Sequence, residues 1–159
     1  MTTVNNITRM LDAKNVEYTA HVLPVEKLGA QEAAEIIGVD PAVVFKTIVV
    51  KRLERGKPIL AVVPGDSEVD LKAVAKAVGE KKVKLTTQNE AEGLTGLKVG
   101  GISPLALLNK GFQTVVDEAA LSYETIFISG GQRGLNLQLA PNDIIQLTQA
   151  RTGKISRSN

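Results

Sequence analysis

The chain of 159 residues contains no cysteine, no tryptophan and a single histidine, His21. Without cysteine, neither a disulfide framework nor a thiolate metal site can form. The chain also lacks the Gly-x-Ser-x-Gly sequence of a nucleophile elbow, a phosphate-binding Gly-x-x-x-x-Gly-Lys-Ser/Thr loop and a dinucleotide-binding fingerprint. Carboxylates do not cluster at the spacing of metal ligands. The sequence therefore predicts no metal and no cofactor, and we interpret His21 as a strand residue rather than a catalytic base.

Long apolar segments are also missing. No stretch reaches the length that a bilayer requires, and the amino-terminal residues lack a basic segment followed by an apolar one. We therefore expect a cytoplasmic protein without a membrane partner. Aromatic residues make up 3% of the chain, which gives little support to a base-stacking surface. The content of 43% apolar and 23% charged residues is typical of a folded protein, and we expect one domain spanning residues 1–159.

Helical and strand patterns are interleaved along the chain. A helix is predicted where a capping residue precedes apolar residues at helical spacing, and a strand where a short run is β-branched or alternates. The predicted helices follow Asn5 or Asn6, cover 31–37, follow Asp70, follow Thr87 and begin at Pro141, and the predicted strands cover 18–23, 43–50, 59–63, 114–116, 125–129 and 135–139. Because several strands are joined by short turns, we expect an α+β domain with a mixed, curved β-sheet.

One lysine lies within an apolar run, residues 43–50. Strand side chains alternate between two faces, so Lys46 shares a face with Val44, Ile48 and Val50. A lysine on an apolar face is costly unless it has a partner or a task. Two explanations follow from this run: an edge strand whose lysine discourages pairing with another sheet, or a functional cation.

Two glycine-rich loops are the other candidates for a site. One covers 99–104 and has Gly100 and Pro104 in a Gly-x-x-x-Pro spacing, and the other is Ser129-Gly130-Gly131. Glycine lets a backbone approach a ligand closely and direct its N–H groups inward. Such donors suit an ester carbonyl whose oxygen becomes negative during attack. Two ordinary tight turns are the alternative explanation.

Basic residues are concentrated in two places, although the formal net charge is only +2. They are Lys72, Lys76, Lys81, Lys82 and Lys84 in one group and Arg151, Lys154 and Arg157 in the other. A basic patch can bind phosphates and attract a polyanion, while a solvated helix face followed by a polar tail is the alternative.

Five stretches of the sequence together carry a resemblance to a known family. They are Val44-Phe45-Lys46-Thr47, residues 70–76, Lys81-Lys82-Val83, residues 99–104 and residues 126–134. Their order and spacing resemble the bacterial YbaK/EbsC group, which is similar to the editing insertion domain of bacterial prolyl-tRNA synthetase. The members that look most similar are Cys-tRNA(Pro)/Cys-tRNA(Cys) deacylases. The resemblance covers most of the chain.

The resemblance implies a barrel-like sheet with helices packed around it, and an enzyme that acts in trans and cleaves the ester of mischarged aminoacyl-tRNA, with Cys-tRNA(Pro) as the first expected substrate. A hydroxyl of the tRNA or the thiol of the substrate is expected to assist the reaction. It implies a catalytic role for Lys46, Gly100 and Gly101, substrate contacts for Leu23, Ile102, Ser103, Pro104, Ser129, Gly130, Gly131 and Asn136, and tRNA contacts for Lys81, Lys82 and Lys84. The implied partners are aminoacyl-tRNA and a prolyl- or cysteinyl-tRNA synthetase, and no DNA is expected.

The chain departs from the cysteinyl deacylases at two positions. Leu23 stands where those proteins have tyrosine, and Asn136 stands where they have aspartate. Both changes concern the choice of amino acid, and alternation along the strand leaves Asn136 facing either the pocket or solvent. Two other functions stay open: a non-catalytic module that binds tRNA or a synthetase, and a hydrolase of small esters.

Overall fold

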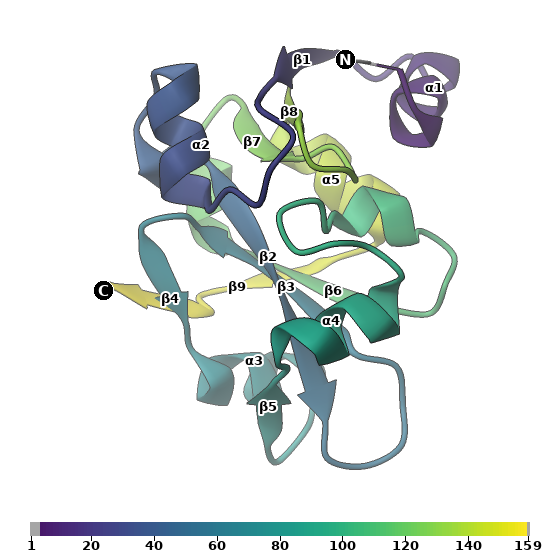
Figure 1. Ribbon diagram of the computed structural model, residues 1–159. Helices are drawn as coiled ribbons and strands as arrows, with labels where there is room; N and C mark the ends of the chain where they lie inside the picture. The colour runs from purple at the N-terminus through teal and green to yellow at the C-terminus, as the bar shows by residue number, and fades with distance from the viewer. Residues whose placement is uncertain (1–3, 159) are drawn as a thin grey trace.

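The computed structural model describes residues 4–158, in which helices surround three β-sheets (Figure 1). The helices are α1 (Asn6–Ala13), α2 (Ala30–Ile37), α3 (Leu71–Val78), α4 (Gln88–Thr95) and α5 (Pro141–Thr148), with short 3₁₀ segments η1 (Pro41–Val43), η2 (Pro104–Leu107) and η3 (Glu118–Ser122). The strands are β1 (Tyr18–Val22), β2 (Phe45–Arg52), β3 (Ile59–Pro64), β4 (Ser67–Val69), β5 (Val83–Leu85), β6 (Gln113–Asp117), β7 (Ile126–Ser129), β8 (Leu135–Leu139), β9 (Arg151–Gly153) and β10 (Ser156–Ser158).

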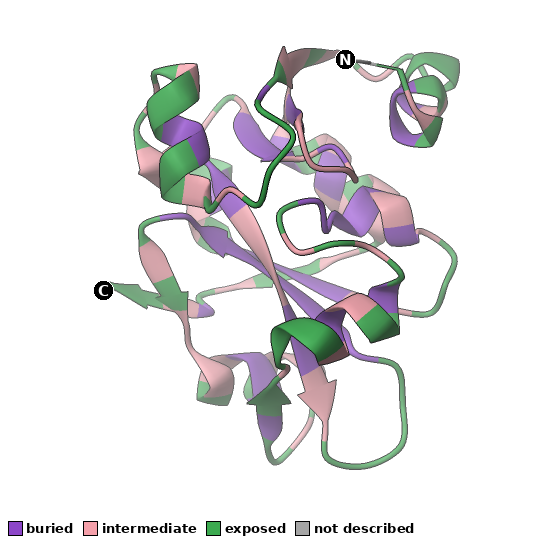
Figure 2. Cartoon of the chain, viewed as in Figure 1, coloured by how far each residue is buried: buried purple, intermediate pink, exposed green. Residues whose placement is uncertain are grey.

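The central sheet has the strand order β5-β2-β3-β6-β9. β2 pairs antiparallel with both β3 and β5, whereas β3–β6 and β6–β9 are parallel pairs, so the sheet is mixed as the sequence predicts. All six residues of β3 are buried, which is visible as an unbroken buried strand at the centre of the molecule (Figure 2). Its β-branched run suits a strand that is covered on both faces.

Two smaller sheets complete the fold. β8 lies between β1 and β7 in an antiparallel sheet, and β4 pairs with β10 near the carboxyl end of the chain (Figure 1). A single parallel bridge, between Val44 and Phe127, connects the first of these sheets to the central one. The α+β class and the mixed sheet are confirmed. The three sheets stay separate, however, and do not close into a barrel within residues 4–158.

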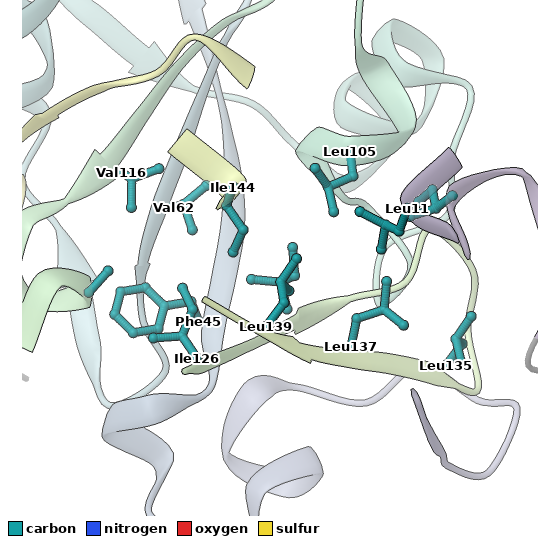
Figure 3. Packing of buried hydrophobic residues seen from close by; sticks show 13 residues of the cluster. Leu11, Phe45, Val62, Leu105, Val116, Ile126, Leu135, Leu137, Leu139 and Ile144 are labelled. Atoms are coloured by element: carbon teal, nitrogen blue, oxygen red, sulfur yellow. The ribbon is translucent and has the colours of Figure 1, made fainter. Parts of the chain in front are cut away.

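Apolar side chains fill both sides of the central sheet. On one side Phe45, Val62 and Val116 belong to a cluster that also contains the inner face of β7 and β8 and residues of α5 and α1, with Leu11 of α1 at its far end beside Leu105 (Figure 3). On the other side, Val74 and Ala75 of α3 pack against β2, β3 and β6. Because the first cluster joins the central sheet to β7 and β8, it fixes the relative position of the two walls that form the cavity described below.

The helix ends agree with their predicted capping residues. The side chains of Asn5, Asp70 and Thr87 accept hydrogen bonds from the backbone at the starts of α1, α3 and α4, and Gly38 and Gly79 end α2 and α3 in the left-handed conformation. None of the helices within residues 4–158 is long and apolar enough to cross a membrane.

The structure adds four short strands that the sequence patterns did not indicate: β4, β5, β9 and β10. The last two replace the expected polar tail. Ile155, between them, is buried; its N–H donates to the carboxylate of Asp117, and its carbonyl accepts from the N–H of Asp70. The carboxyl-terminal segment is therefore part of the packed structure.

Candidate active site

A cavity of about 320 Å³ lies between β2, the segment that precedes α2, the 99–102 loop and the ends of β7 and β8. Six of the side chains or backbone segments predicted for a site line it: Leu23, Lys46, Gly100, Ile102, Ser129 and Asn136. These residues come from distant parts of the sequence. The structure therefore brings together about half of the predicted site residues, including both positions where the chain departs from the cysteinyl deacylases.

Lys46 is half-buried at the edge of this cavity. Within residues 4–158 its ammonium has no hydrogen bond and no carboxylate within 4.0 Å. Burial lowers the pKa of Lys46, while the more distant carboxylates of Glu68 and Asp66 act in the opposite direction. β5 pairs only with the last three residues of β2, and at Lys46 β2 pairs with β3 alone, so the edge-strand explanation stays open beside the functional one. An unpaired, partly desolvated cation beside a cavity is suited to bind an anionic or carbonyl oxygen.

The backbone of β2 has an open side at Thr47, which also lines the cavity. β3 pairs along nearly the whole strand, but β5 covers only its last three residues. The carbonyl of Val49 faces the β5 side, where it accepts hydrogen bonds from the N–H and hydroxyl of Thr86. Because backbone groups alternate sides along a strand, the N–H of Thr47 points the same way. No strand within residues 4–158 is in register with Thr47 on that side.

Asn136 faces the cavity and is only 6% exposed. It lies on β8 between His21 of β1 and Ser129 of β7, and its side-chain Oδ1 has no hydrogen-bond partner within residues 4–158. A buried acceptor that is left unpaired costs about 1–3 kcal/mol. A ligand donor, such as an ammonium or hydroxyl group, would remove that cost.

The Gly-x-x-x-Pro loop divides between the cavity and the protein interior. Gly100 has φ +95°, a conformation that favours glycine, and it lines the cavity together with Ile102. Gly101 does not line it. Its N–H donates to the carbonyl of Lys98, and a Cβ there would lie 2.8–2.9 Å from the backbone of the 132–133 turn. Gly101 therefore allows two loops to pack closely.

Ser103 and Pro104 turn away from the cavity. Both are buried, and the hydroxyl of Ser103 accepts a hydrogen bond from the N–H of Leu105 at the start of η2. Ser103 and Pro104 therefore stabilise the loop from inside the protein and do not form part of the cavity surface.

The second glycine loop contributes Ser129 to the cavity, but not Gly130 or Gly131. The N–H of Gly130 donates to the carbonyl of Leu135, and the N–H of Gly131 donates to the hydroxyl of Ser129. Gly131 lines a different hollow, next to α1. The donors that the sequence places in this loop are therefore used to hold the turn itself.

Several contributors were not identified from the sequence. Besides Thr47, they are Glu26, Thr86, Thr87 and Gln88 at the cavity, where Thr87 also caps α4. The capping-box spacing of Thr87 and Glu90 predicted the helix, but it did not indicate that the helix begins beside a cavity. The two loops that meet here are joined by a hydrogen bond from Nε of Arg133 to the carbonyl of Val99, 2.8 Å long.

The predicted tRNA contacts lie outside the cavity. Lys81 and Lys82 are exposed in the turn that follows α3, and Lys84 is exposed on β5, opposite Lys51 of β2. They form a basic surface of their own, which we call the β5 lysines.

Other groups at or near the site have structural partners. His21 makes a 3.0 Å hydrogen bond with Gln138 and packs against the ring of Phe127, as expected for a strand residue. Across residues 4–158, the His, Asp and Glu side chains form no group of three or more that could hold a metal ion. The cavity thus offers a cation, backbone N–H groups and an amide oxygen.

Comparison with known proteins identifies the fold and the family. The model of the family described as aminoacyl-tRNA editing domain matches residues 26–147. The Enterococcus faecalis protein EbsC, named as a Cys-tRNA(Pro)/Cys-tRNA(Cys) deacylase, is 37% identical over 153 residues, which cover 95% of this chain and 92% of EbsC. A proline–tRNA ligase of Thermodesulfovibrio yellowstonii is 26% identical over 77% of this chain, but over only 20% of the ligase.

Solved structures extend the comparison. The crystal structure of the hypothetical protein APE2540 superposes with a TM-score of 0.86 at 27% identity, covering 96% of this chain and all of that one. A crystal structure described as a trans-editing enzyme for prolyl tRNA synthetase has a TM-score of 0.77 at 23% identity, with 98% and 100% coverage, and at this identity it supports the fold alone. This chain belongs to the aminoacyl-tRNA editing domain family.

Proposed function

We propose that the protein is an aminoacyl-tRNA deacylase that edits mischarged tRNA in trans, with Cys-tRNA(Pro) as its first expected substrate. The observation that carries the proposal is the cavity, which is lined by Lys46, whose ammonium has no ion pair within residues 4–158, and by Asn136, whose buried Oδ1 has no partner there. The 37% identity to EbsC over nearly the whole of both chains supports the same reaction.

The chemistry requires little from protein side chains. Water attacks the ester carbonyl, the bond between the carbonyl carbon and the ribose oxygen breaks, and the proton of the water passes to that ribose oxygen by way of the neighbouring ribose hydroxyl. This route needs no protein base, in agreement with a cavity that has no histidine or paired carboxylates among its lining residues. Positioning and stabilisation of the oxyanion then account for most of the rate.

The oxyanion requires N–H donors that are not already used. The N–H groups of Gly101, Gly130 and Gly131 are all engaged within their own turns. The N–H of Thr47 lies on the open side of β2, and Gly100 brings its backbone to the same cavity. We assign the oxyanion to these two backbone segments, with Lys46 as the nearby positive charge.

A cysteine substrate has a second route. Its own thiol can attack the ester carbonyl: a carbon–sulfur bond forms, the bond to the ribose oxygen breaks, and the thiol proton passes to that oxygen, which releases the tRNA and leaves a cyclic thiolactone. Chromatography of the released amino acid separates the two routes, because water yields free cysteine. An enzyme that also acts on alanyl or seryl esters cannot depend on the thiol.

Specificity follows from Leu23 and Asn136. Leu23 gives the cavity an apolar wall, and in such a wall one methylene changes discrimination by only about 1–3 kcal/mol. Asn136 supplies a neutral acceptor for the α-ammonium group. We therefore expect Cys-tRNA(Pro) to be cleaved together with other small aminoacyl esters, such as those of alanine and serine.

The decisive experiment is a deacylation panel. Cys-, Ala-, Ser- and Pro-charged tRNA(Pro) are incubated with the native chain and with Asn136→Asp, and the loss of the ester is followed over time. We expect cleavage of the three small esters, with a shift in their relative rates for Asn136→Asp. Strict selectivity for cysteine in both proteins would contradict the specificity argument. Binding of tRNA without turnover would instead assign the chain as a non-catalytic module.

The β5 lysines are the proposed contact for the acceptor stem. Neutralising Lys81, Lys82 and Lys84 together should weaken tRNA binding and flatten its salt dependence by roughly one unit of slope per lost phosphate contact. Cleavage of a minimal aminoacyl-nucleotide should barely change. Whether a prolyl- or cysteinyl-tRNA synthetase assists can be tested by adding each enzyme to the same reaction.

A further inference from the structure

A second cleft, of about 580 Å³, adjoins the cavity and shares Lys46 with it. It is bordered by β4, the first turn of α3 and β10, and by β5, the edge strand of the central sheet (Figure 1). We call it the β4–β10 cleft. Lys46 and Ile48 of β2 reach it, so a ligand that occupies the cavity can continue past Lys46 into this cleft.

Two of the three cations that line the β4–β10 cleft, Lys46 and Lys72, have no salt bridge within residues 4–158. Asp70 is already engaged, because its carboxylate accepts the N–H of Ala73 at the start of α3. Glu68 pairs with Arg157 at 3.5 Å, but both side chains are more than half exposed, so this pair contributes little stability and can be exchanged for a phosphate.

The surface between these charges is apolar. Ile48, Val69, Leu71 and Leu85 line the cleft, and Leu85 is 51% exposed. An apolar surface beside cations suits a ligand that alternates a flat, weakly polar group with an anion. A single-stranded nucleic acid has this pattern, since a base accompanies each phosphate.

We propose that the β4–β10 cleft binds the single-stranded 3′ end of the tRNA, with phosphates at Lys72 and Arg157 and a base against Leu85. The inference depends on the proposed function and specifies how its substrate is held. The ester is joined to the last ribose, so the nucleotide chain must leave the cavity through an opening. The β4–β10 cleft provides one, and Lys46 lies where the two spaces meet.

The test compares three substrates that carry the same aminoacyl ester: adenosine, which has no phosphate, the trinucleotide CCA, and the full tRNA. The variants are Lys72→Gln and Arg157→Gln. Lys76→Gln is the matched control, because Lys76 lies one turn further along α3, is exposed, and does not line the cleft. None of the three residues lines the cavity, so kcat on aminoacyl-adenosine should stay at the native value.

We expect Lys72→Gln and Arg157→Gln each to raise KM for the trinucleotide by roughly three- to tenfold, as for a partly exposed charged contact. KM for aminoacyl-adenosine should not change, and Lys76→Gln should behave as the native chain on both small substrates. Glu68→Gln should lower KM for the trinucleotide, because it releases Arg157 and removes a negative charge. Equal effects on adenosine and trinucleotide, or equal effects of Lys72→Gln and Lys76→Gln, would overturn the proposal.

Direct binding keeps this test independent of catalysis. Uncharged CCA trinucleotide is titrated against the native chain, the three glutamine variants and Glu68→Gln, and thermal melting verifies that each is folded. Weaker binding for Lys72→Gln and Arg157→Gln alone supports the cleft even if no ester is cleaved, in which case only the proposed function fails. Binding that all variants share unchanged would reject the cleft even if the ester is cleaved.

Discussion

The side-chain amide of Asn5 donates a 2.8 Å hydrogen bond to the carbonyl oxygen of Gly130, 125 residues further along the chain. The same amide donates to Oε1 of Gln132 at 3.1 Å, while its oxygen accepts the N–H of Thr8 and so caps α1. One side chain therefore both starts the first helix and holds the turn whose first residue, Ser129, lines the cavity. The two roles use different atoms and can be separated by mutation.

Asn5→Asp should separate them. A carboxylate still accepts the N–H of Thr8, so α1 keeps its cap, but it cannot donate to Gly130 and would face that carbonyl with a negative charge. We expect nearly native helix content with a several-fold loss in kcat. Asn5→Ala should lose both interactions and about 1 kcal/mol of stability as well. Circular dichroism, melting and kcat should be measured on both variants; native kcat in Asn5→Asp would show that the turn needs no support from α1.

Lys46→Met should abolish most of the activity without unfolding the protein. The substitution keeps the aliphatic stem and removes only a charge that has no ion pair within residues 4–158. A loss of about 10²-fold or more in kcat is expected for removal of a charge at an oxyanion. Lys46→Arg serves as the control that retains the charge. A folded Lys46→Met protein with full activity would reject the assigned role.

The same variant carries a pH signature in stability. Because burial lowers the pKa of Lys46 in the folded state from its ordinary value of 10.5, the unfolded chain holds this proton more tightly. The charge therefore destabilises the fold below the folded-state pKa, and this effect disappears as the pH rises towards 10.5. Denaturant midpoints should place Lys46→Met at or above the native chain at neutral pH, with a difference that shrinks in alkaline buffer. A difference that grew with pH would contradict the direction of the shift.

Asn136→Leu should raise the stability of the protein and weaken its binding of substrate. The substitution removes a buried oxygen without a partner and leaves an apolar side chain of similar volume in the cavity wall that also contains Leu23. We expect the free energy of unfolding to rise by about 1–3 kcal/mol, since the cost of an unpaired buried acceptor is removed. KM for aminoacyl-tRNA should rise, because the ammonium group of the substrate loses its acceptor. A variant that is less stable than the native chain would indicate that Asn136 has a structural partner.

Thr47→Pro should remove one N–H at little structural cost. That N–H points to the open side of β2, so no hydrogen bond of the sheet is lost, and proline is accepted in strands at such positions. A loss of about 10²–10³-fold in kcat is expected for one oxyanion donor. Thr47→Val is the control, because it removes the hydroxyl and keeps the N–H. Replacement of the amide by an ester bond at Thr47 repeats the test without the proline ring, and native kcat in both would reject this donor.

Gly101→Ala should primarily destabilise the fold. The new Cβ would lie 2.8–2.9 Å from backbone atoms of Gln132 and Arg133, so one of the two loops must move. We expect a loss of about 1–3 kcal/mol, typical of overpacking, and a lower rate because both loops border the cavity. Unfolding in denaturant and turnover should be measured on the same preparation. Native stability with a lost rate would instead indicate a direct role for Gly101 at the ester.

Local signals in the sequence were sufficient for the larger elements. Asp70 and Gly79, for example, mark the two ends of α3, and the apolar run around Lys46 marks β2. Local signals could not predict β9 and β10, because these strands are only three residues long and consist mainly of polar residues. They are strands because β6 and β4, far away in the sequence, offer open edges, and because Ile155 between them is buried.

The sequence predicted those parts of the site that depend on local backbone conformation. It did not predict those that depend on packing between distant segments. Gly100 and Lys46 were singled out as candidates from the residues around them, and both line the cavity, while their roles stay predictions. The direction of Asn136, by contrast, depends on the pairing of β8 with both β1 and β7, which alternation along one strand does not specify. The engagement of Gly101 and Gly130 within their own turns depends on contacts between loops that no sequence pattern reveals.

The pairing of β1 with β8 has a kinetic consequence. Tyr18 faces Leu139 in that register, so the sheet that carries Asn136 is complete only after a loop of more than a hundred residues has closed. Closure of such a loop is entropically unfavourable until tertiary contacts compensate for it, and topologies rich in such pairings fold slowly. The β2–β3 hairpin, which carries Lys46, can form early. During refolding, secondary structure should therefore recover before deacylase activity, which returns only when the two walls of the cavity have met.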